Sequence, residues 1–557
     1  MLKLFQMSSL EKLTPGGGAS APSLRGGEYA SASALRGEVF SYQIIYYSDE
    51  RQAYSIDAKA VAPNGAGAGG AFGIKLYDVE NVPCGLPAYP HYHDEHYLST
   101  APGLFPDLLC PVANGEVVAR PADRALWVSV SVAGDAPAGD YELAINFSGK
   151  DGACMAKTLA LRVAAAKLPP QELICTQWFH SDCISSFYNV GAFSEEHWRL
   201  LDGFVEMAAA HGINMILTPI FTPPLDTQIG GERPTVQLVG IEKRGGEYTF
   251  DFSLLKRWIE MCRGRGVKYF EMAHLFTQWG ALCTPKIIAT EGGKPRRIFG
   301  WDVAALSPEY RNFLDRFLPA LTAFLREAGA DKSTYFHISD EPHGEEMLAQ
   351  YKKAKEIVAR HLEGFKIIDA LSEYEFYKSG AVENPIPANN AIEPFLAAGI
   401  KDLWTYYCCG QAVGVSNRFI AMPSYRNRII GIQMYKYGIA GFLQWGYNFY
   451  YSQHSKRLIN PFVTTDADYA FPSGDAFSVY PGANGPLPSL RLKVFYEALQ
   501  DMRALSLLEK VMPKNEIIAM IEDAAGMEIT FSQYPQNPEF ILDLRANVNA
   551  VLAKNPI

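Results

Sequence analysis

One pattern recurs from residue 174 onward: an amphipathic helical stretch, a glycine, and then a short apolar run. Examples are "AAAHGINMILTP", "RGRGVKYFEMAH" and "REAGADKSTYFHIS". A helix often ends at a left-handed residue, a conformation that glycine adopts at the lowest cost. The glycines at these positions are Gly212, Gly266, Gly329, Gly364, Gly399 and Gly438. This alternation of helices and strands predicts a mostly parallel sheet covered by helices.

Two further runs, "ICTQWFHS" and "AVENPIPAN", bring the predicted strands to eight. Eight strand–helix units predict a (β/α)8 TIM barrel over about residues 172–505. A doubly wound open sheet is the alternative. Such folds normally carry a glycine-rich phosphate loop, and neither GxGxxG nor GxxxxGK[ST] follows a predicted strand here. The barrel is therefore favoured, and its catalytic groups are expected at the carboxyl ends of the strands.

The N-terminal part of the chain has a different pattern of apolar residues. The runs "SYQIIYYS", "ALWVSVSVAG" and "YELAINFSG" are short, apolar or alternating, and bounded by Gly, Pro, Asp and Asn. They predict an all-β sandwich over residues 1–166. The two prolines of "AAAKLPPQE" indicate a linker before the barrel. After the barrel, residues 506–557 are predicted to be a mainly helical extension.

Composition limits the class of partner. The 557 residues are 48% apolar and carry a formal net charge of −10, which argues against a nucleic-acid partner. No apolar run is long enough to span a membrane. The first residues lack a signal-peptide pattern, and nine scattered cysteines suit reduced thiols, so a cytoplasmic location is expected. No cofactor is expected.

The stretch "YFHISDEPHG" ends the fourth predicted strand in two adjacent acids, Asp340 and Glu341. Acids at this end of a barrel are often functional, although they can also simply cap the next helix. Regular alternation would turn Glu341 toward the barrel mouth and Asp340 away from it. Both acids reach one substrate only if the strand bends at its end, which Pro342 favours.

Asp-Glu-Pro resembles the Asn-Glu-Pro that ends strand four in many retaining barrel glycosidases, where Glu is the acid/base and strand seven supplies a Glu nucleophile. The seventh predicted strand here, "DLWTYYCCG", has no acid at its end. An ionised Asp only accepts hydrogen bonds, which suits an N–H on sugar carbon two. We therefore expect substrate-assisted catalysis, in which the 2-acetamido oxygen attacks carbon one. Asp340 stabilises the acetamide, and Glu341 is the acid and then the base.

Several motifs, in this order, resemble glycoside hydrolase family 123 and the wider domain-of-unknown-function family 4091. They include "GLFPDLL", "HLFTQWGA", "FHISDEP", "WTYYCC" and "PSGDAFSVYPG". The resemblance implies a β-sandwich followed by a barrel, and action on β-linked N-acetylgalactosamine. It also implies Asp340 as stabiliser and Glu341 as acid/base. A small glycoside or oligosaccharide is the expected substrate.

Other residues at or beyond the predicted strand ends are candidates for substrate binding. Tyr406 or Tyr407 could donate to the acetamide oxygen, and Trp404 and Trp445 could form an apolar platform for the sugar. The remaining candidates, which could bind hydroxyl groups, are Trp178, His180, His274, Gln278, Trp279, Asn448 and Asp475. For each of these residues, packing in the core is the competing interpretation.

The stretch "YPHYHDEHYL" (89–98) collects histidines and acids of the kinds that bind zinc. It lies in the predicted sandwich, and no HExxH pattern is present. We therefore expect a polar loop rather than a metal site.

Two other functions remain open from the sequence. One is a retaining glycosidase for sugars without an acetamide, with another rim acid such as Glu373 or Asp369 as its nucleophile. The other is a non-catalytic carbohydrate-binding protein, for which both acids would face solvent with no pocket beside them.

Overall fold

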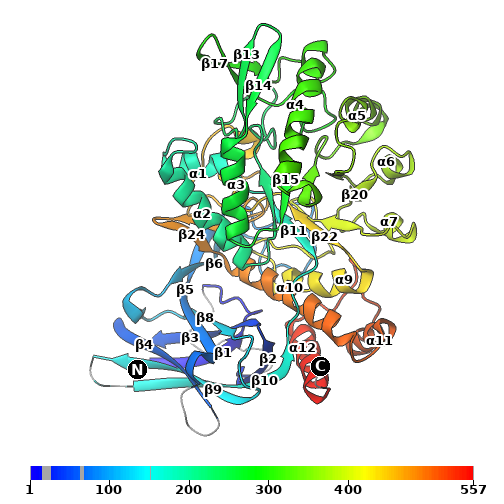
Figure 1. Cartoon of the computed structure of the whole chain (residues 1–557). Helices are drawn as coiled ribbons and strands as arrows, with labels where there is room; N and C mark the ends of the chain where they lie inside the picture. The colour runs from blue at the N-terminus through cyan, green and yellow to red at the C-terminus, as the bar shows by residue number, and fades with distance from the viewer. Residues whose placement is uncertain (1, 16–26, 63–67, 151, 153, 556–557) are drawn as a thin grey trace. The chain divides into compact units, whose positions relative to one another are not determined.

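The structure, a computed structural model, describes residues 2–15, 27–62, 68–150, 152 and 154–555 (Figure 1). By their contacts the residues form two compact units. The first contains Met1–Gln171, Ala412–Tyr437 and Leu487–Ile557, and the second contains Glu172–Gln411 and Gly438–Pro486. Contacts thus group residues 412–437 and 487–505 with the N-terminal sheets. The three domains drawn from the sequence stay a prediction.

The first unit is built on two five-stranded sheets, with the orders β1-β3-β8-β5-β6 and β2-β10-β9-β4-β7. All neighbouring strands are antiparallel except β2 and β10. The strands are β1 (Leu2–Ser8), β2 (Ser31–Arg36), β3 (Val39–Ser48), β4 (Gln52–Val61), β5 (Phe72–Cys84), β6 (Gly103–Pro111), β7 (Glu116–Ala119), β8 (Arg124–Val132), β9 (Gly139–Gly149) and β10 (Cys154–Lys167).

Side chains from both sheets share one core, as the predicted sandwich requires. Tyr42 and Val128 come from the first sheet, and Ile145 and Leu161 come from the second. The first sheet is also buried on its other face, where Trp127 packs into a second core with helices. Burial on both faces explains why β3 reads as an almost continuous apolar run instead of an alternating one.

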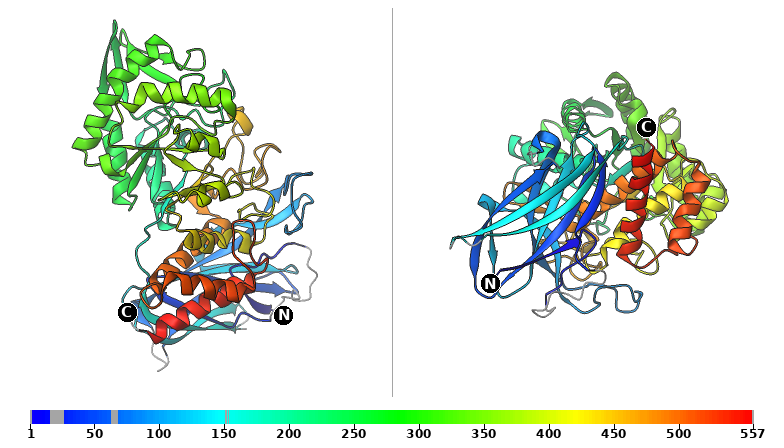
Figure 2. Two further views of the ribbon diagram at one scale, coloured as in Figure 1. Left: turned by 90° about the vertical axis from the view of Figure 1, so that its right-hand side faces the viewer. Right: turned by 90° about the horizontal axis from the view of Figure 1, so that it is seen from below.

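The helices of this second core come from two parts of the chain. They are α8 (Ser424–Arg428), α9 (Ile430–Tyr437), α10 (Leu490–Leu508), α11 (Lys514–Ala525) and α12 (Pro538–Lys554). Helix α12 lies beside β2 and β10 (Figure 2). Among the described residues, no helix is both long and apolar enough to cross a membrane.

The second unit is a barrel of eight parallel strands in the order β20-β19-β18-β15-β12-β11-β22-β21. A parallel bridge between Ala388 and Tyr406 joins the two outer strands, β20 and β21, and closes the barrel. The predicted (β/α)8 fold is therefore correct. The strands are β11 (Ile174–Gln177), β12 (Met215–Thr218), β15 (Tyr269–Met272), β18 (Thr334–Phe336), β19 (Lys366–Ala370), β20 (Asn384–Ile386), β21 (Trp404–Tyr406) and β22 (Gly441–Gln444).

Local sequence signals place the helices between these strands. All six glycines that were expected to end helices have positive φ angles, between 58° and 92°. The hydroxyl of Ser194 caps its helix by accepting a hydrogen bond from the N–H of His197. The helices of this unit are α1 (Ser181–Tyr188), α2 (Glu195–Ala210), α3 (Ser253–Gly264), α4 (Pro308–Glu327), α5 (Gly344–Ala359), α6 (Tyr374–Lys378) and α7 (Glu393–Ala397).

Long insertions follow three of the strands. Residues 235–252 contain a hairpin, formed by β13 (Gly240–Arg244) and β14 (Glu247–Asp251). Residues 277–306 contain a second hairpin, formed by β16 (Ile287–Glu291) and β17 (Lys294–Phe299). Strand β16 pairs in parallel with β13, which belongs to a different insertion. Local sequence does not reveal this pairing. The third insertion ends in a short pair, β23 (Val479–Gly482) and β24 (Gly485–Pro488).

Candidate active site

A cavity of about 160 Å³ opens among the loops that follow the carboxyl ends of the barrel strands. Its walls combine aromatic rings with a few polar groups, which is the usual make-up of a site for a small molecule. The lining residues are Trp178, Leu225, Asp226, Gln278, Trp279, Asp340, Glu341, Ala370, Tyr406, Cys408, Cys409, Leu443, Trp445, Gln453, His454 and Phe471.

The backbone bends at the end of the fourth strand. Strand β18 stops at Phe336, and Glu341 has a left-handed φ of 41°. The bend is held by two main-chain bonds: the Glu341 N–H donates to the Ala370 carbonyl (3.1 Å), and the Trp279 N–H donates to the Asp340 carbonyl (3.0 Å). Regular alternation is therefore broken, and both Asp340 and Glu341 line the same cavity.

The two neighbouring acids differ in their surroundings. Burial, and then the charge of Glu341, raises the pKa of Asp340 well above its usual value. Glu341 instead accepts a hydrogen bond from the Tyr406 hydroxyl, at 2.7 Å from its Oε1 atom. Asp340 is therefore an acid that tends to hold a proton.

A buried hydrogen-bonded cluster lies beneath this pair. The His337 ring contacts Glu271 Oε1 through Nε2 (2.5 Å) and Asp369 Oδ1 through Nδ1 (3.2 Å). Although burial lowers it, the hydrogen bonds to Asp369 and Glu271 and the charges of both carboxylates raise the pKa of His337 to about 10. Glu271 also accepts a bond from Trp178 Nε1 at 2.8 Å, so one carboxylate orients both an aromatic wall of the cavity and the imidazolium.

His274, His337 and Asp369 have ligand atoms within 4.8 Å of one another, a spacing that could suit a metal ion. Both ring nitrogens of His337 are already bonded to the two carboxylates, which is the arrangement of a salt-bridged histidine. His274 stacks on His337 with the ring centroids 4.3 Å apart. Burial, and then the charge of His337, lowers the pKa of His274 well below its usual value, so His274 is neutral. We assign no metal to this cluster.

Seven of the residues proposed from the sequence line the cavity: Asp340, Glu341, Trp178, Gln278, Trp279, Tyr406 and Trp445. The other six do not. Trp404 packs inside the barrel with Tyr335, and Tyr407 turns its ring to Phe442 on the opposite face from Tyr406. His274 lies below the mouth against His337.

Three of these six residues support the rim of the barrel instead. Asn448 bonds both the N–H (2.9 Å) and the carbonyl (3.1 Å) of His180, which ties the end of β22 to the end of β11. The His180 ring contacts the Trp445 carbonyl at 2.9 Å. Asp475 accepts a bond from Trp445 Nε1 at 2.7 Å and thereby fixes the ring that faces the cavity.

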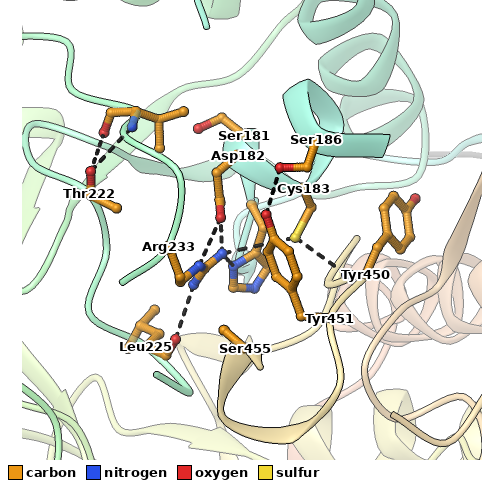
Figure 3. A network of polar contacts seen from close by, with 12 residues as sticks. Ser181, Asp182, Cys183, Ser186, Thr222, Leu225, Arg233, Tyr450, Tyr451 and Ser455 are labelled. Carbon is orange, nitrogen blue, oxygen red and sulfur yellow. Dashed lines mark hydrogen bonds and ion pairs between the residues drawn. The ribbon is translucent and has the colours of Figure 1, made fainter. Parts of the chain in front are cut away.

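A buried ion pair holds the loop that follows β12 (Figure 3). Arg233 donates two hydrogen bonds to Asp182 of α1, at 2.8 and 2.7 Å, and one to the Leu225 carbonyl at 3.1 Å. Its guanidinium also lies 5.6 Å from the ring centres of Phe449 and Tyr451. Arg233 therefore connects three segments that surround the cavity.

The sequence did not single out Asp226 or His454. Both lie in long insertions, without a strand end or motif to mark them, and they meet only in the folded barrel. One acid of the 89–98 loop, Asp94, is held by contacts away from the cavity. Asp94 pairs with Arg426 at 2.8 Å and accepts a bond from the Gly414 N–H at 2.6 Å.

Comparison with known proteins agrees with this geometry. The model of the catalytic domain of glycoside hydrolase 123 matches residues 178–508. A (β/α)8 barrel with an acid pair in its mouth, matched by such a model, defines a glycoside hydrolase. The chain belongs to glycoside hydrolase family 123. No curated protein matches it.

Solved structures support the fold. A family 123 glycoside hydrolase from Clostridium perfringens, studied for glycolipid glycan hydrolysis, superposes with a TM-score of 0.74 at 16% identity, over 100% of this chain and 98% of the other. A glycoside hydrolase from Bacteroides vulgatus gives 0.33 at 11% identity, over 86% and 79%. A GH5 xyloglucanase from Bacteroides ovatus gives 0.32 at 9%, over 85% and 98%. The last two scores are too low to support an inference.

Proposed function

We propose that this glycoside hydrolase is a retaining β-N-acetylhexosaminidase that uses the 2-acetamido group of its substrate as the nucleophile. N-acetylgalactosamine is the sugar expected from the family resemblance. The observation that carries the proposal is the composition of the cavity wall. Asp340 and Glu341 stand side by side, and the end of β21, where the related glycosidases place a nucleophile, presents Tyr406 instead of an acid.

The roles of the two acids follow from their contacts. When substrate binds, the acetamide N–H donates to Asp340 as a carboxylate, and the proton of the pair passes to Glu341. Glu341 protonates the leaving oxygen while the acetamide oxygen attacks carbon one. Asp340 stabilises the positive charge that develops on the acetamide nitrogen. Glu341 then takes a proton from a water that attacks carbon one, and the bond between carbon one and the acetamide oxygen breaks, which restores the acetamide. We propose that Tyr406, whose hydroxyl donates to Glu341 in this structure, turns that single donor to the acetamide oxygen when substrate binds.

The alternatives lose support. Asp369 is fully buried and bonded to His337, and Glu373 accepts a bond from the Gly344 N–H at 3.0 Å. Neither residue lines the cavity, so neither is placed to act as an enzyme nucleophile. A non-catalytic protein with both acids facing open solvent does not fit a cavity that contains them. A cytoplasmic location and a small glycoside as substrate remain part of the proposal.

Turnover of an aryl β-N-acetylgalactosaminide by Asp340→Asn and Glu341→Gln tests this function. Each change should lower kcat by about 10²–10⁴-fold, as expected for loss of a proton-transfer or charge-stabilising group. A thiazoline mimic of the cyclised intermediate should inhibit the unchanged enzyme. Undiminished turnover in both variants, or a covalent glycosyl-enzyme trapped on a side chain, would contradict the proposed mechanism.

A further inference from the structure

The cavity contains a third carboxylate, that of Asp226, which follows β12. The loop around it is anchored at three main-chain or side-chain atoms of this residue. Its N–H donates to Gln278 Oε1 (2.6 Å), its carbonyl accepts from Ser455 Oγ (2.7 Å), and its Oδ2 accepts from the His454 N–H (2.9 Å). The side chain is thereby held in one position, with two insertions of the barrel packed around it.

This position is maintained against a conformational cost. Asp226 has a φ of 39°, in the left-handed region, where a non-glycine residue costs on the order of 1 kcal/mol or more. The carbonyl of the preceding residue, Leu225, is fixed by Arg233, which is itself paired with Asp182 (Figure 3). Strain that a buried ion pair maintains beside a cavity is typical of functional positions.

The carboxylate has capacity to bind a ligand. Only Oδ2 receives a hydrogen bond from the described residues, which leaves Oδ1 available as an acceptor. Burial, opposed by the hydrogen bond from the His454 N–H, raises the pKa of Asp226 to about 6, so the group is ionised at neutral pH. Tyr406 flanks the acid pair from β21, and Asp226 flanks it from β12, on another side of the barrel.

We propose that Asp226 is a specificity-determining residue that accepts a hydrogen bond from a ring hydroxyl of the substrate sugar and selects neutral over anionic sugars. This inference rests on the proposed function, because it places a sugar in the cavity. No lysine or arginine is among the lining residues that the structure describes, whereas three carboxylates are. A sulfated or carboxylated sugar would therefore meet like charges without a compensating cation.

The test measures binding of N-acetylgalactosamine, its 3-, 4- and 6-deoxy analogues and its 6-sulfate by calorimetry. The variants are Asp226→Asn and Asp226→Gly, because Asn and Gly both tolerate a positive φ and either one can carry the test. The matched control is Asp302→Asn, an exposed acid in another rim loop that pairs with Arg297 and does not line the cavity. Thermal midpoints verify that each variant is folded.

In the unchanged protein, one deoxy analogue should bind at least about tenfold more weakly, because a site built for a hydroxyl is left with an unpaired acceptor. Asp226→Asn and Asp226→Gly should bind the parent sugar more weakly by a similar factor. In the Asn variant the one carbonyl oxygen stays with the His454 N–H, so an NH2 donor replaces the Oδ1 acceptor. Both variants should show no further loss for that same analogue, and should discriminate less against the sulfate. Asp302→Asn should match the unchanged protein in every measurement.

The outcomes separate this inference from the proposed function. If the unchanged protein binds and hydrolyses the substrate, but both Asp226 variants bind all the sugars as it does, the inference is wrong and the function stands. If aryl substrates are not hydrolysed but sugar binding depends on Asp226 as described, the inference stands and the function is wrong. If the unchanged protein binds none of the sugars, both are wrong.

Discussion

The Tyr406 hydroxyl lies 2.7 Å from Oε1 of Glu341, although the two residues are 65 positions apart in the chain. The contact crosses the mouth of the barrel, from the end of β21 to the loop after β18. It provides Glu341, the proposed acid/base, with a donor on the side where related glycosidases carry a second acid. Glu341 is therefore oriented without a neighbouring negative charge on that side.

Replacement of this donor should impair catalysis. Tyr406→Phe removes one hydrogen bond to a charged group, worth about 1.5–3 kcal/mol, so kcat/KM should fall by roughly 10- to 100-fold. Tyr407→Phe is the control: its ring packs on Phe442 away from the cavity, and its kcat should stay near that of the unchanged enzyme. Equal effects of the two changes would contradict the assignment.

The stability of the protein should depend on pH through His337. Its folded pKa of about 10 lies above the ordinary value of 6.5, so the stabilisation is fully present below about pH 6.5 and is lost as pH rises through about 10. Between these limits the slope is about 1.4 kcal/mol per pH unit. Thermal midpoints recorded from pH 6.5 to 9.5 should fall more steeply for the unchanged protein than for His337→Gln. Parallel curves would show that His337 is neutral in the folded state.

Removal of Arg233 should strongly destabilise the barrel. Arg233→Ala leaves Asp182 buried without its partner, which costs about 3–5 kcal/mol. The double variant Arg233→Met with Asp182→Leu should recover much of this loss, since no unpaired charge remains. Denaturant midpoints measure both effects. Arg162→Ala, at an exposed pair with Asp140, should change the free energy of unfolding by less than about 1 kcal/mol, and a comparable loss there would argue against burial as the cause.

Asp475 should act on substrate binding through Trp445. Asp475→Ala removes the acceptor of the indole N–H, so the ring that faces the cavity loses its fixed orientation. We expect KM to rise about tenfold with little change in kcat, in line with about 1–3 kcal/mol for an unmet buried donor. Asp475→Asn retains a carbonyl acceptor and should stay close to the unchanged enzyme. A loss confined to kcat would place Asp475 in the chemistry instead.

Periodicity and glycine placement were sufficient to predict the barrel. All eight strands lie at or just before the predicted strand ends. Six of them were marked by a helix, a left-handed glycine and an apolar run, and the runs "ICTQWFHS" and "AVENPIPAN" supplied the other two. The pairing of β13 with β16 could not be predicted, since it joins two insertions that are separate in sequence and carry no shared pattern. Such long-range pairing depends on which loops lie next to one another once the barrel has folded.

The residues of the site could be predicted only in part, because some of them are placed by contacts between distant loops. Strand alternation shows that Tyr406 and Tyr407 face opposite sides, but it does not say which one faces the mouth. Asp226 was missed because its role depends on contacts with Gln278, His454 and Ser455, which lie in other loops. Residues at strand ends are constrained by the strand itself, whereas residues within long insertions are placed only by tertiary contacts.

The carboxylate of Glu271 bonds two residues whose identities could otherwise change independently among related sequences. It bonds the indole of Trp178 in the cavity wall and the ring of His337, three positions before Asp340. A relative that lacks an acid at position 271 would leave a buried indole N–H and a buried imidazolium without their partner. We therefore expect positions 178, 271 and 337 to change together or not at all among family members, so that this trio marks sequences sharing the same cavity floor.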